Sequence, residues 1–244
     1  MSQTPERPQY LQAAMGILVQ RAVDDSAAWR KFRSRYYSAS GLMRCPRETL
    51  YDKAGTPLDP VTYPNPSSIK CMEAGTAIHD YLQGLLVDKR FFEDVEVGFV
   101  VHKWLSKGRV DGVLTDRQGT VEFKTKNSYA FSQLSQPDED HVVQVTLGLV
   151  GTGIQKGYIW YICRDTLEAK EFEITVVPAV VQRIEERVEL LENSITMRTL
   201  PPKPYSDPDK VPCSRCSFRA ACYASKTPDW AAIENLPRPK GGAK

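Results

Sequence analysis

Four of the six cysteines in this chain divide between two distant segments. Cys45 lies early in the chain, whereas Cys213, Cys216 and Cys222 lie within ten residues of one another near its end. Four thiolates are the ligands expected of a structural zinc ion or of an iron–sulfur cluster. Because such a site would close a very long loop, it would tie the early segment of the chain to the late one.

The spacing of these cysteines favours a cluster over zinc. Structural zinc sites usually bring two close pairs of ligands, whereas this chain offers one pair, Cys213 and Cys216, and two single cysteines. A structural zinc ion is one alternative to a cluster. The other alternative is that the four cysteines are unligated thiols. Cys71 and Cys163 lie in apolar stretches, and we expect both to be buried thiols without a ligand role.

A second pattern, Asp111 followed by Glu122-Phe123-Lys124, lies between the cysteines. Side chains alternate along a strand, so Glu122 and Lys124 share a face. If the preceding strand pairs as a hairpin, Asp111 comes within reach of Glu122. Two carboxylates then suit Mg²⁺ or Mn²⁺, and Lys124 can orient a metal-bound water or stabilise charge on a phosphate. The alternative is an exposed hairpin with alternating charges, because an E-x-K triplet alone is common.

His79 ends the run Gly75-Thr76-Ala77-Ile78-His79 on an expected helix. A lone histidine is more often an ordinary core or surface residue than a ligand. Together with two carboxylates, however, it could complete a metal site, and an imidazole ligand is compatible with Mn²⁺.

These residues resemble the RecB-like branch of the PD-(D/E)XK nucleases, specifically its iron–sulfur subgroup, which includes the CRISPR adaptation nuclease and the AddB nuclease domain. The resemblance runs from about Ser38 to Cys222. Its motifs are Ser38-Ala39-Ser40-Gly41-Leu42, Cys45-Pro46-Arg47 with Tyr51, Gly75 to His79, Asp111, Glu122 with Lys124, Gln144, and the three late cysteines. The family often has a tyrosine four residues after the glutamine, where this chain has Gly148.

The resemblance implies an α/β fold: a restriction-endonuclease-like mixed β-sheet flanked by helices, with an iron–sulfur module formed by the two chain ends. Together with the resemblance, the hydrophobic pattern and the composition predict an N-terminal helical segment (1–37), a nuclease domain (38–226) and a flexible tail (227–244). The site residues that the resemblance implies are His79, Asp111 and Glu122 for Mg²⁺ or Mn²⁺, Asp111, Glu122, Lys124 and Gln144 for catalysis, and Cys45, Cys213, Cys216 and Cys222 for a [4Fe-4S] cluster.

The function expected from this resemblance is that of a metal-dependent DNA exonuclease acting on single-stranded ends, in recombination, end processing or CRISPR spacer acquisition. An integrase, a recombinase or a helicase would be a natural partner. One alternative is a catalytically silent DNA-binding or scaffold protein of the same fold. Another is a zinc-stabilised nucleic-acid-binding protein whose E-x-K triplet is accidental.

Composition adds few constraints. The net charge of +2 means that a nucleic-acid surface has to be local. Arg30, Lys31, Arg33 and Arg35 alternate with aromatic residues and could hold phosphates, although the sequence alone favours an ordinary amphipathic helix. We expect an intracellular protein without a membrane segment, because no signal peptide or apolar span is evident.

Hydrophobic periodicity predicts the secondary structure. Helices are expected at 10–35, from a serine cap at Ser67 or Ser68 to 87, at 140–150 and at 179–197. Strands are expected at 95–102, 108–114, 120–126, 157–163 and 169–176.

Overall fold

A computed structural model describes residues 10–30, 33–63 and 65–237. Its helices are α1 (Tyr10–Trp29), α2 (Pro46–Lys53), α3 (Pro66–Asp88), α4 (Ser128–Ser132), α5 (Glu139–Thr152), α6 (Pro178–Thr196), α7 (Arg219–Tyr223) and α8 (Trp230–Glu234). Its strands are β1 (Tyr37–Ser38), β2 (Phe92–Val101), β3 (Ser106–Leu114), β4 (Thr120–Lys126), β5 (Gly157–Cys163) and β6 (Ala169–Ile174). Every helix and strand expected from the sequence is present.

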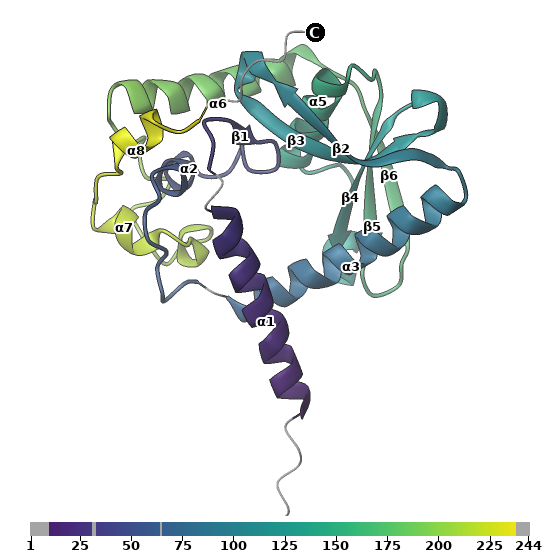
Figure 1. The fold of residues 1–244 in the computed structure, drawn as a ribbon, viewed down its shortest axis with the longest axis horizontal. Helices are drawn as coiled ribbons and strands as arrows, with labels where there is room; N and C mark the ends of the chain where they lie inside the picture. The colour runs from purple at the N-terminus through teal and green to yellow at the C-terminus, as the bar shows by residue number, and fades with distance from the viewer. Residues whose placement is uncertain (1–9, 31–32, 64, 238–244) are drawn as a thin grey trace, which may run out of the picture.

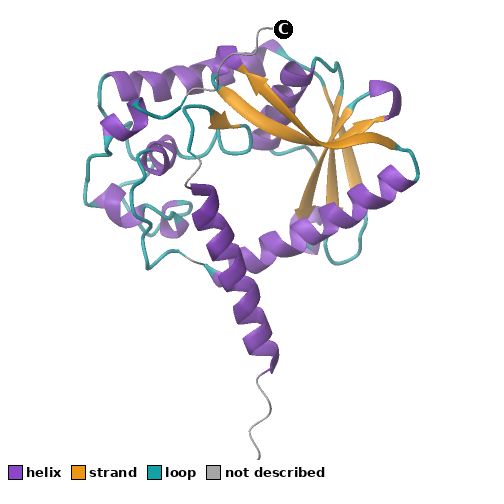
Figure 2. Ribbon diagram, in the orientation of Figure 1, coloured by secondary structure: helices purple, strands orange, loops and turns teal. Residues whose placement is uncertain are grey.

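The strands form one mixed sheet (Figure 2). Their order is β1-β3-β4-β5-β6, and β2 also pairs with β3. β2 pairs antiparallel with β3 over the whole length of β3, from Ser106 to Leu114. A strand has two edges, so β1 and β4 share the other edge of β3. β1 pairs there at Ser106 and Lys107, and β4 pairs at Gly112 and Val113. Between these two pairings, β3 residues 108–111 are left without a strand neighbour on that edge.

Helices cover both faces of the sheet (Figure 1). On one face, Val121 and Phe123 of β4 are fully buried together with Phe92 and Ile162, beneath apolar side chains of α3. On the other face, α5 packs against β2, β3, β4 and β5, and α6 lies behind it. Since β4 is covered on both faces, its polar side chains are held in a largely dry environment, which explains why Glu122 is only 4 % exposed.

The early and late segments of the chain meet beside the sheet, where α2, α7 and α8 gather (Figure 1). Tyr51 on α2 is fully buried and donates a hydrogen bond to the carbonyl oxygen of Lys226 at 2.7 Å. Arg47 donates to the carbonyl oxygen of Pro201 at 2.8 Å. Asp59 accepts a hydrogen bond from the backbone N–H of Ala220 at 3.0 Å. These contacts close the long loop that the cysteine spacing predicts, whatever the cysteines bind.

Two expectations about helix ends are wrong. α1 ends at Trp29, so Arg30, Arg33 and Arg35 follow the helix instead of forming its solvated face, while Lys31 lies outside the described residues. Asn65 caps α3 in place of a serine, because its side chain accepts from the N–H of Ser68 and Pro66 opens the first turn.

The segment 227–244 is expected to be a flexible tail. Its described part contains α8, whose Trp230 and Ile233 are buried, and residues 238–244 lie outside the described residues. Cys71, expected to be buried, is exposed on α3, whereas Cys163 is buried as expected. No helix in the described part of the chain is long and apolar enough to cross a membrane.

Candidate active site

The candidate site lies where β3 and β4 diverge. Gly112 and Val113 pair with Val121 and Thr120, and in that register Asp111 faces Glu122 across the two strands. Instead of a ladder hydrogen bond, the Oδ2 atom of Asp111 accepts the backbone N–H of Phe123 at 2.7 Å. The hairpin geometry expected from the sequence is therefore confirmed, and it brings the two carboxylates together.

Glu122, Lys124 and Gln144 form a closed triangle of hydrogen bonds. Lys124 Nζ donates to Glu122 Oε1 at 2.6 Å and to Gln144 Oε1 at 3.0 Å. Gln144, on α5, donates through Nε2 to the same Glu122 oxygen at 2.6 Å. The glutamine thus holds both the lysine and the carboxylate, which fixes the position of the lysine ammonium group.

His79 reaches the site from α3. Its Nδ1 atom lies 3.9 Å from Asp111 Oδ2, and its ring packs on Phe123 with 5.5 Å between the centroids. Helix α3 can approach β4 closely because Gly75 faces Thr125: a Cβ at this glycine would lie 3.1 Å from the threonine hydroxyl.

The three predicted metal ligands are neighbours, but they do not form a ready coordination sphere. Among the described residues, no three His, Cys, Asp or Glu side chains converge closely enough to hold an ion. One oxygen of Glu122 is engaged by Lys124 and Gln144, and one oxygen of Asp111 is engaged by backbone. Each carboxylate keeps a second oxygen that could turn toward a cation, so the donor set of two carboxylates and an imidazole fits Mg²⁺ or Mn²⁺ in its chemistry.

Burial shifts the pKa values at this site in the direction that disfavours charge. Burial, reinforced by the neighbouring Asp111 carboxylate, raises the pKa of Glu122 to about 8. Burial also raises the pKa of Asp111, and it lowers the pKa of His79. Burial thus favours the neutral form of all three groups.

Glu96 and Gln83 belong to the same surroundings, although the sequence analysis did not identify them. Gln83 Nε2 donates to the backbone carbonyl of Asp111 at 2.8 Å and to Glu96 Oε1 at 3.0 Å, while Arg109 Nε lies 3.1 Å from Glu96 Oε2. Glu96 adopts the left-handed backbone region, with φ of 54°, inside β2. The antiparallel register sets Glu96 opposite Asp111, so pairing the predicted strand 95–102 with the next one would have revealed it.

Close packing at Gly148 explains why this chain lacks a tyrosine four residues after Gln144. A Cβ at Gly148 would lie 2.8 Å from Cγ1 of Val110 on β3, so α5 lies too close to the sheet for any side chain at this position.

An open cavity of about 760 Å³ adjoins the site. Its wall includes Asp111 and Gln144, the strand pair Ser38 and Lys107, and Glu96. This cavity, which we call the cleft, opens along the edge of β3 that neither β1 nor β4 covers. The pairing pattern of the sheet thus leaves room for a substrate beside Asp111 and Gln144, whereas Glu122 and Lys124 lie behind them and do not line the cleft.

The four predicted cluster ligands line one small cavity between the chain ends: Cys45, Cys213, Cys216 and Cys222. Its volume is about 20 Å³, little more than one water molecule needs. Thiolates suit a cluster by their chemistry, but among the described residues no three of these side chains converge closely enough to hold a metal ion. Burial raises the pKa of Cys216 to about 12 and also raises that of Cys222. Metal binding here would release protons.

Comparison with sequence models of known protein families gives no match, and no curated protein matches the chain. Solved structures with a similar fold exist. The crystal structure of SSO0001 has a TM-score of 0.55 at 20% identity, covering 86% of this chain and 95% of its own. An alkaline exonuclease from Laribacter hongkongensis, LHK-Exo, has a TM-score of 0.51 at 16% identity, covering 70% of this chain and 93% of its own. Its complex with dAMP has the same TM-score at 17% identity. At these identities the likeness shows a shared fold.

Proposed function

We propose that this chain is a metal-dependent nuclease that hydrolyses phosphodiester bonds in DNA. The observation that carries the proposal is the meeting of Asp111, Glu122 and Lys124 where β3 and β4 diverge, beside an open cleft. The shared fold with an alkaline exonuclease, of which one structure holds dAMP, supports it.

Each site residue has a role in this proposal. Asp111, Glu122 and His79 would hold the divalent ion, which would supply neutralisation of phosphate charge and a more acidic water molecule. Lys124 provides a fixed positive charge close to the reacting phosphate. Gln144 positions Lys124 and Glu122 through its two hydrogen bonds.

The cysteine module has a structural role in the proposal. Cys45, Cys213, Cys216 and Cys222 would hold a [4Fe-4S] cluster, which would tie the early segment around α2 to the late segment around α7. Zinc is the alternative occupant. Iron and sulfide analysis of anaerobically purified protein, beside zinc analysis, decides between them.

In its finer form the proposal is an exonuclease acting on single-stranded DNA ends inside the cell, in recombination, end processing or CRISPR spacer acquisition, with an integrase, recombinase or helicase as partner. This part rests on the sequence motifs and not on the geometry of the site.

A catalytically silent DNA-binding protein of the same fold is the second candidate. One observation favours it: in the described structure Glu122 is engaged by Lys124 and Gln144, and no three potential ligands converge on one point. The two candidates differ in a single measurable property, the cleavage of DNA in the presence of a divalent ion.

The test compares linear and circular single-stranded DNA incubated with the full chain and Mn²⁺. An exonuclease cleaves the linear strand and leaves the circle intact, whereas Glu122→Gln abolishes cleavage. Glu186→Gln, an exposed substitution on α6, serves as the matched control and retains activity. Undiminished cleavage by Glu122→Gln would overturn the site assignment, and cleavage of the circle would overturn the exonuclease mode.

A further inference from the structure

A second cavity, of about 420 Å³, lies between the cleft and the cysteine cavity. It shares Ser38 and Lys107 with the cleft, and it shares Glu48 and Phe218 with the cysteine cavity. We call it the basic cavity because the cationic residues lining it are Arg30, Arg33, Arg44, Lys53 and Lys107.

The charge of this cavity is unbalanced. Five cationic side chains face only two carboxylates, Glu48 and Asp52. Asp52 is already paired with Arg30 at 3.3 Å, and burial raises the pKa of Glu48, although Arg44 opposes that shift. An anion is therefore the class of ligand that the lining favours.

Two of the cationic side chains, Lys53 and Arg30, are held by other groups of the protein and form part of the cavity wall. Lys53 donates to the carbonyl oxygens of Ser34 at 2.8 Å and Tyr36 at 3.1 Å. Arg30 pairs with Asp52 and donates to the carbonyl oxygen of Thr56 at 3.0 Å. Lys53 is engaged by backbone carbonyls and Arg30 is paired with Asp52, so both side chains help to fix the shape of the basic cavity.

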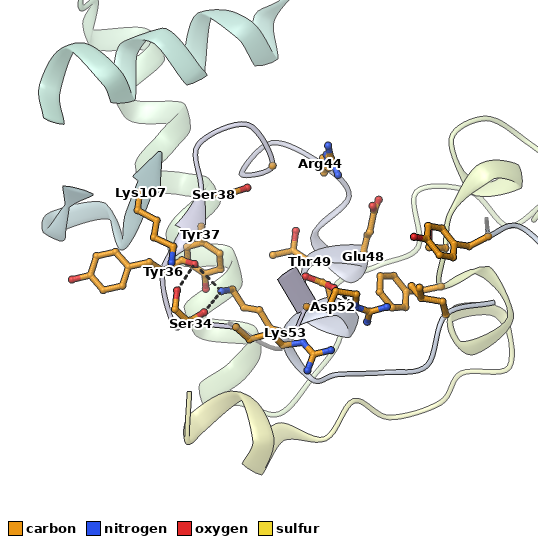
Figure 3. A pocket seen from close by; sticks show the side chains of 17 residues that line it. Ser34, Tyr36, Tyr37, Ser38, Arg44, Glu48, Thr49, Asp52, Lys53 and Lys107 are labelled. Carbon is orange, nitrogen blue, oxygen red and sulfur yellow. Dashed lines mark hydrogen bonds and ion pairs between the residues drawn. The ribbon is translucent and has the colours of Figure 1, made fainter. Parts of the chain in front are cut away.

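Lys107 and Arg44 are placed to meet a ligand. Within the described ranges, neither side chain takes part in a hydrogen bond or an ion pair. Lys107 lies with Ser38 on one side of the cavity, and Arg44 lies with Thr49 on the other (Figure 3). An ammonium group, a guanidinium group and two hydroxyls on opposite walls match the donors that proteins use for phosphate.

We propose that the basic cavity binds a phosphate of the nucleic-acid strand that is cleaved in the cleft, at a point away from the reacting bond. This inference rests on the proposed function. Its geometric basis is the pairing of β1 with β3, which sets Ser38 opposite Lys107, so that the basic cavity and the cleft meet across this strand pair. A strand lying in the cleft would continue past Lys107 into the basic cavity and be anchored there.

Binding without cleavage tests the proposal. A fluorescent single-stranded oligonucleotide is titrated with the full chain in EDTA, so that catalysis does not enter the measurement. Lys107→Ala and Arg44→Ala should each weaken binding about tenfold, as expected for loss of a charge-assisted hydrogen bond. Each should also lower the slope of log K against log salt by about 0.7, the value for one single-strand phosphate contact.

Two control variants separate a specific contact from a general loss of charge. Lys156→Ala removes the same charge from an exposed position outside both cavities and should leave affinity unchanged. Lys107→Arg keeps the charge and should restore most of the binding that Lys107→Ala loses.

Oligonucleotides carrying one neutral methylphosphonate linkage locate the bound phosphate. When the neutral linkage stands at the contacted phosphate, the wild-type protein should bind this oligonucleotide only as tightly as Lys107→Ala binds the unmodified one. Lys107→Ala should bind the modified and the unmodified oligonucleotides equally well. Additional oligonucleotides with and without a terminal phosphate decide whether the contacted group is terminal or internal.

Each outcome separates the two proposals. Equal binding by wild type, Lys107→Ala and Arg44→Ala, or equal loss in Lys156→Ala, overturns the basic-cavity site while leaving the nuclease proposal standing. Weakened binding in the two variants, without any cleavage by wild type in Mn²⁺, supports the site and overturns the nuclease proposal. Failure of wild type to bind any strand overturns the basic-cavity site.

Discussion

Substituting alanine for Gly148 tests how tightly the helix that carries Gln144 lies on the sheet. In an open helical position, Gly→Ala stabilises by about 0.5–1 kcal/mol because the unfolded chain loses freedom. At Gly148 the new Cβ would lie 2.8 Å from Val110 Cγ1. Val110 is 4 % exposed and stiff at χ1, so relief requires movement of the helix or the strand, at a cost of about 1–3 kcal/mol.

Gly84, in the interior of α3, provides the matched control. A Cβ at that position meets nothing within 4 Å, so Gly84→Ala should stabilise by about 0.5–1 kcal/mol. The helix-propensity gain is common to both variants. Their difference in unfolding free energy therefore isolates the overpacking cost of about 1–3 kcal/mol.

Urea denaturation of wild type, Gly84→Ala and Gly148→Ala measures these differences directly. We expect Gly148→Ala to be the least stable of the three and Gly84→Ala the most stable. If Gly148→Ala were as stable as Gly84→Ala, α5 would not lie as close to β3 as described. The explanation for the missing tyrosine would then be refuted.

Two further predictions concern the candidate active site and the cysteine module. Lys124→Ala should abolish cleavage while leaving oligonucleotide binding within about threefold of wild type, because one of several phosphate-facing charges is lost; normal cleavage would contradict its role. Cys216→Ala should lower the melting temperature and the iron or zinc content of the protein. Cys71 is exposed, so Cys71→Ala should alter neither. A Cys216→Ala protein with its full metal content would exclude a ligand role for Cys216.

Lys53 makes stability depend on pH. Burial lowers its pKa from 10.5 to about 8, so between pH 8 and 10.5 the unfolded chain binds the additional proton. The lower pKa of Lys53 in the folded state therefore makes the free energy of unfolding rise with pH, by up to about 3 kcal/mol between pH 8 and 10.5. Urea denaturation of wild type and Lys53→Met at several pH values should show the difference between the two growing in favour of wild type over this window; a constant difference would contradict it.

The sequence predicted the sheet and the carboxylate–lysine site because both depend on short-range patterns. Period-two alternation located β3 and β4, and the short connection between them fixed the register that sets Asp111 opposite Glu122. Helices α3 and α5 were found by their apolar periodicity, so His79 and Gln144 were expected on the correct elements.

Features that depend on tertiary packing were missed. Glu96 joins the site through cross-strand pairing of β2 with β3, which the sequence analysis did not work out. α8 is only five residues long, too short to show periodicity, and is held by burial of Trp230. The basic cavity combines residues from before β1, from α2 and from β3, and Arg33 and Lys107 have no local signal that links them.

The most direct test of the proposed nuclease is cleavage of end-labelled single-stranded DNA by anaerobically purified protein. The reaction is run with Mn²⁺ and with EDTA, for wild type, Asp111→Asn and Asp116→Asn. Asp116 is exposed and adopts the left-handed backbone region, which asparagine tolerates, so its substitution is the matched control. We predict cleavage by wild type and Asp116→Asn in Mn²⁺, and none in EDTA or by Asp111→Asn. Metal-independent cleavage, or full activity of Asp111→Asn, would contradict the proposed site, and absence of cleavage by folded wild type in Mn²⁺ would contradict the proposed function.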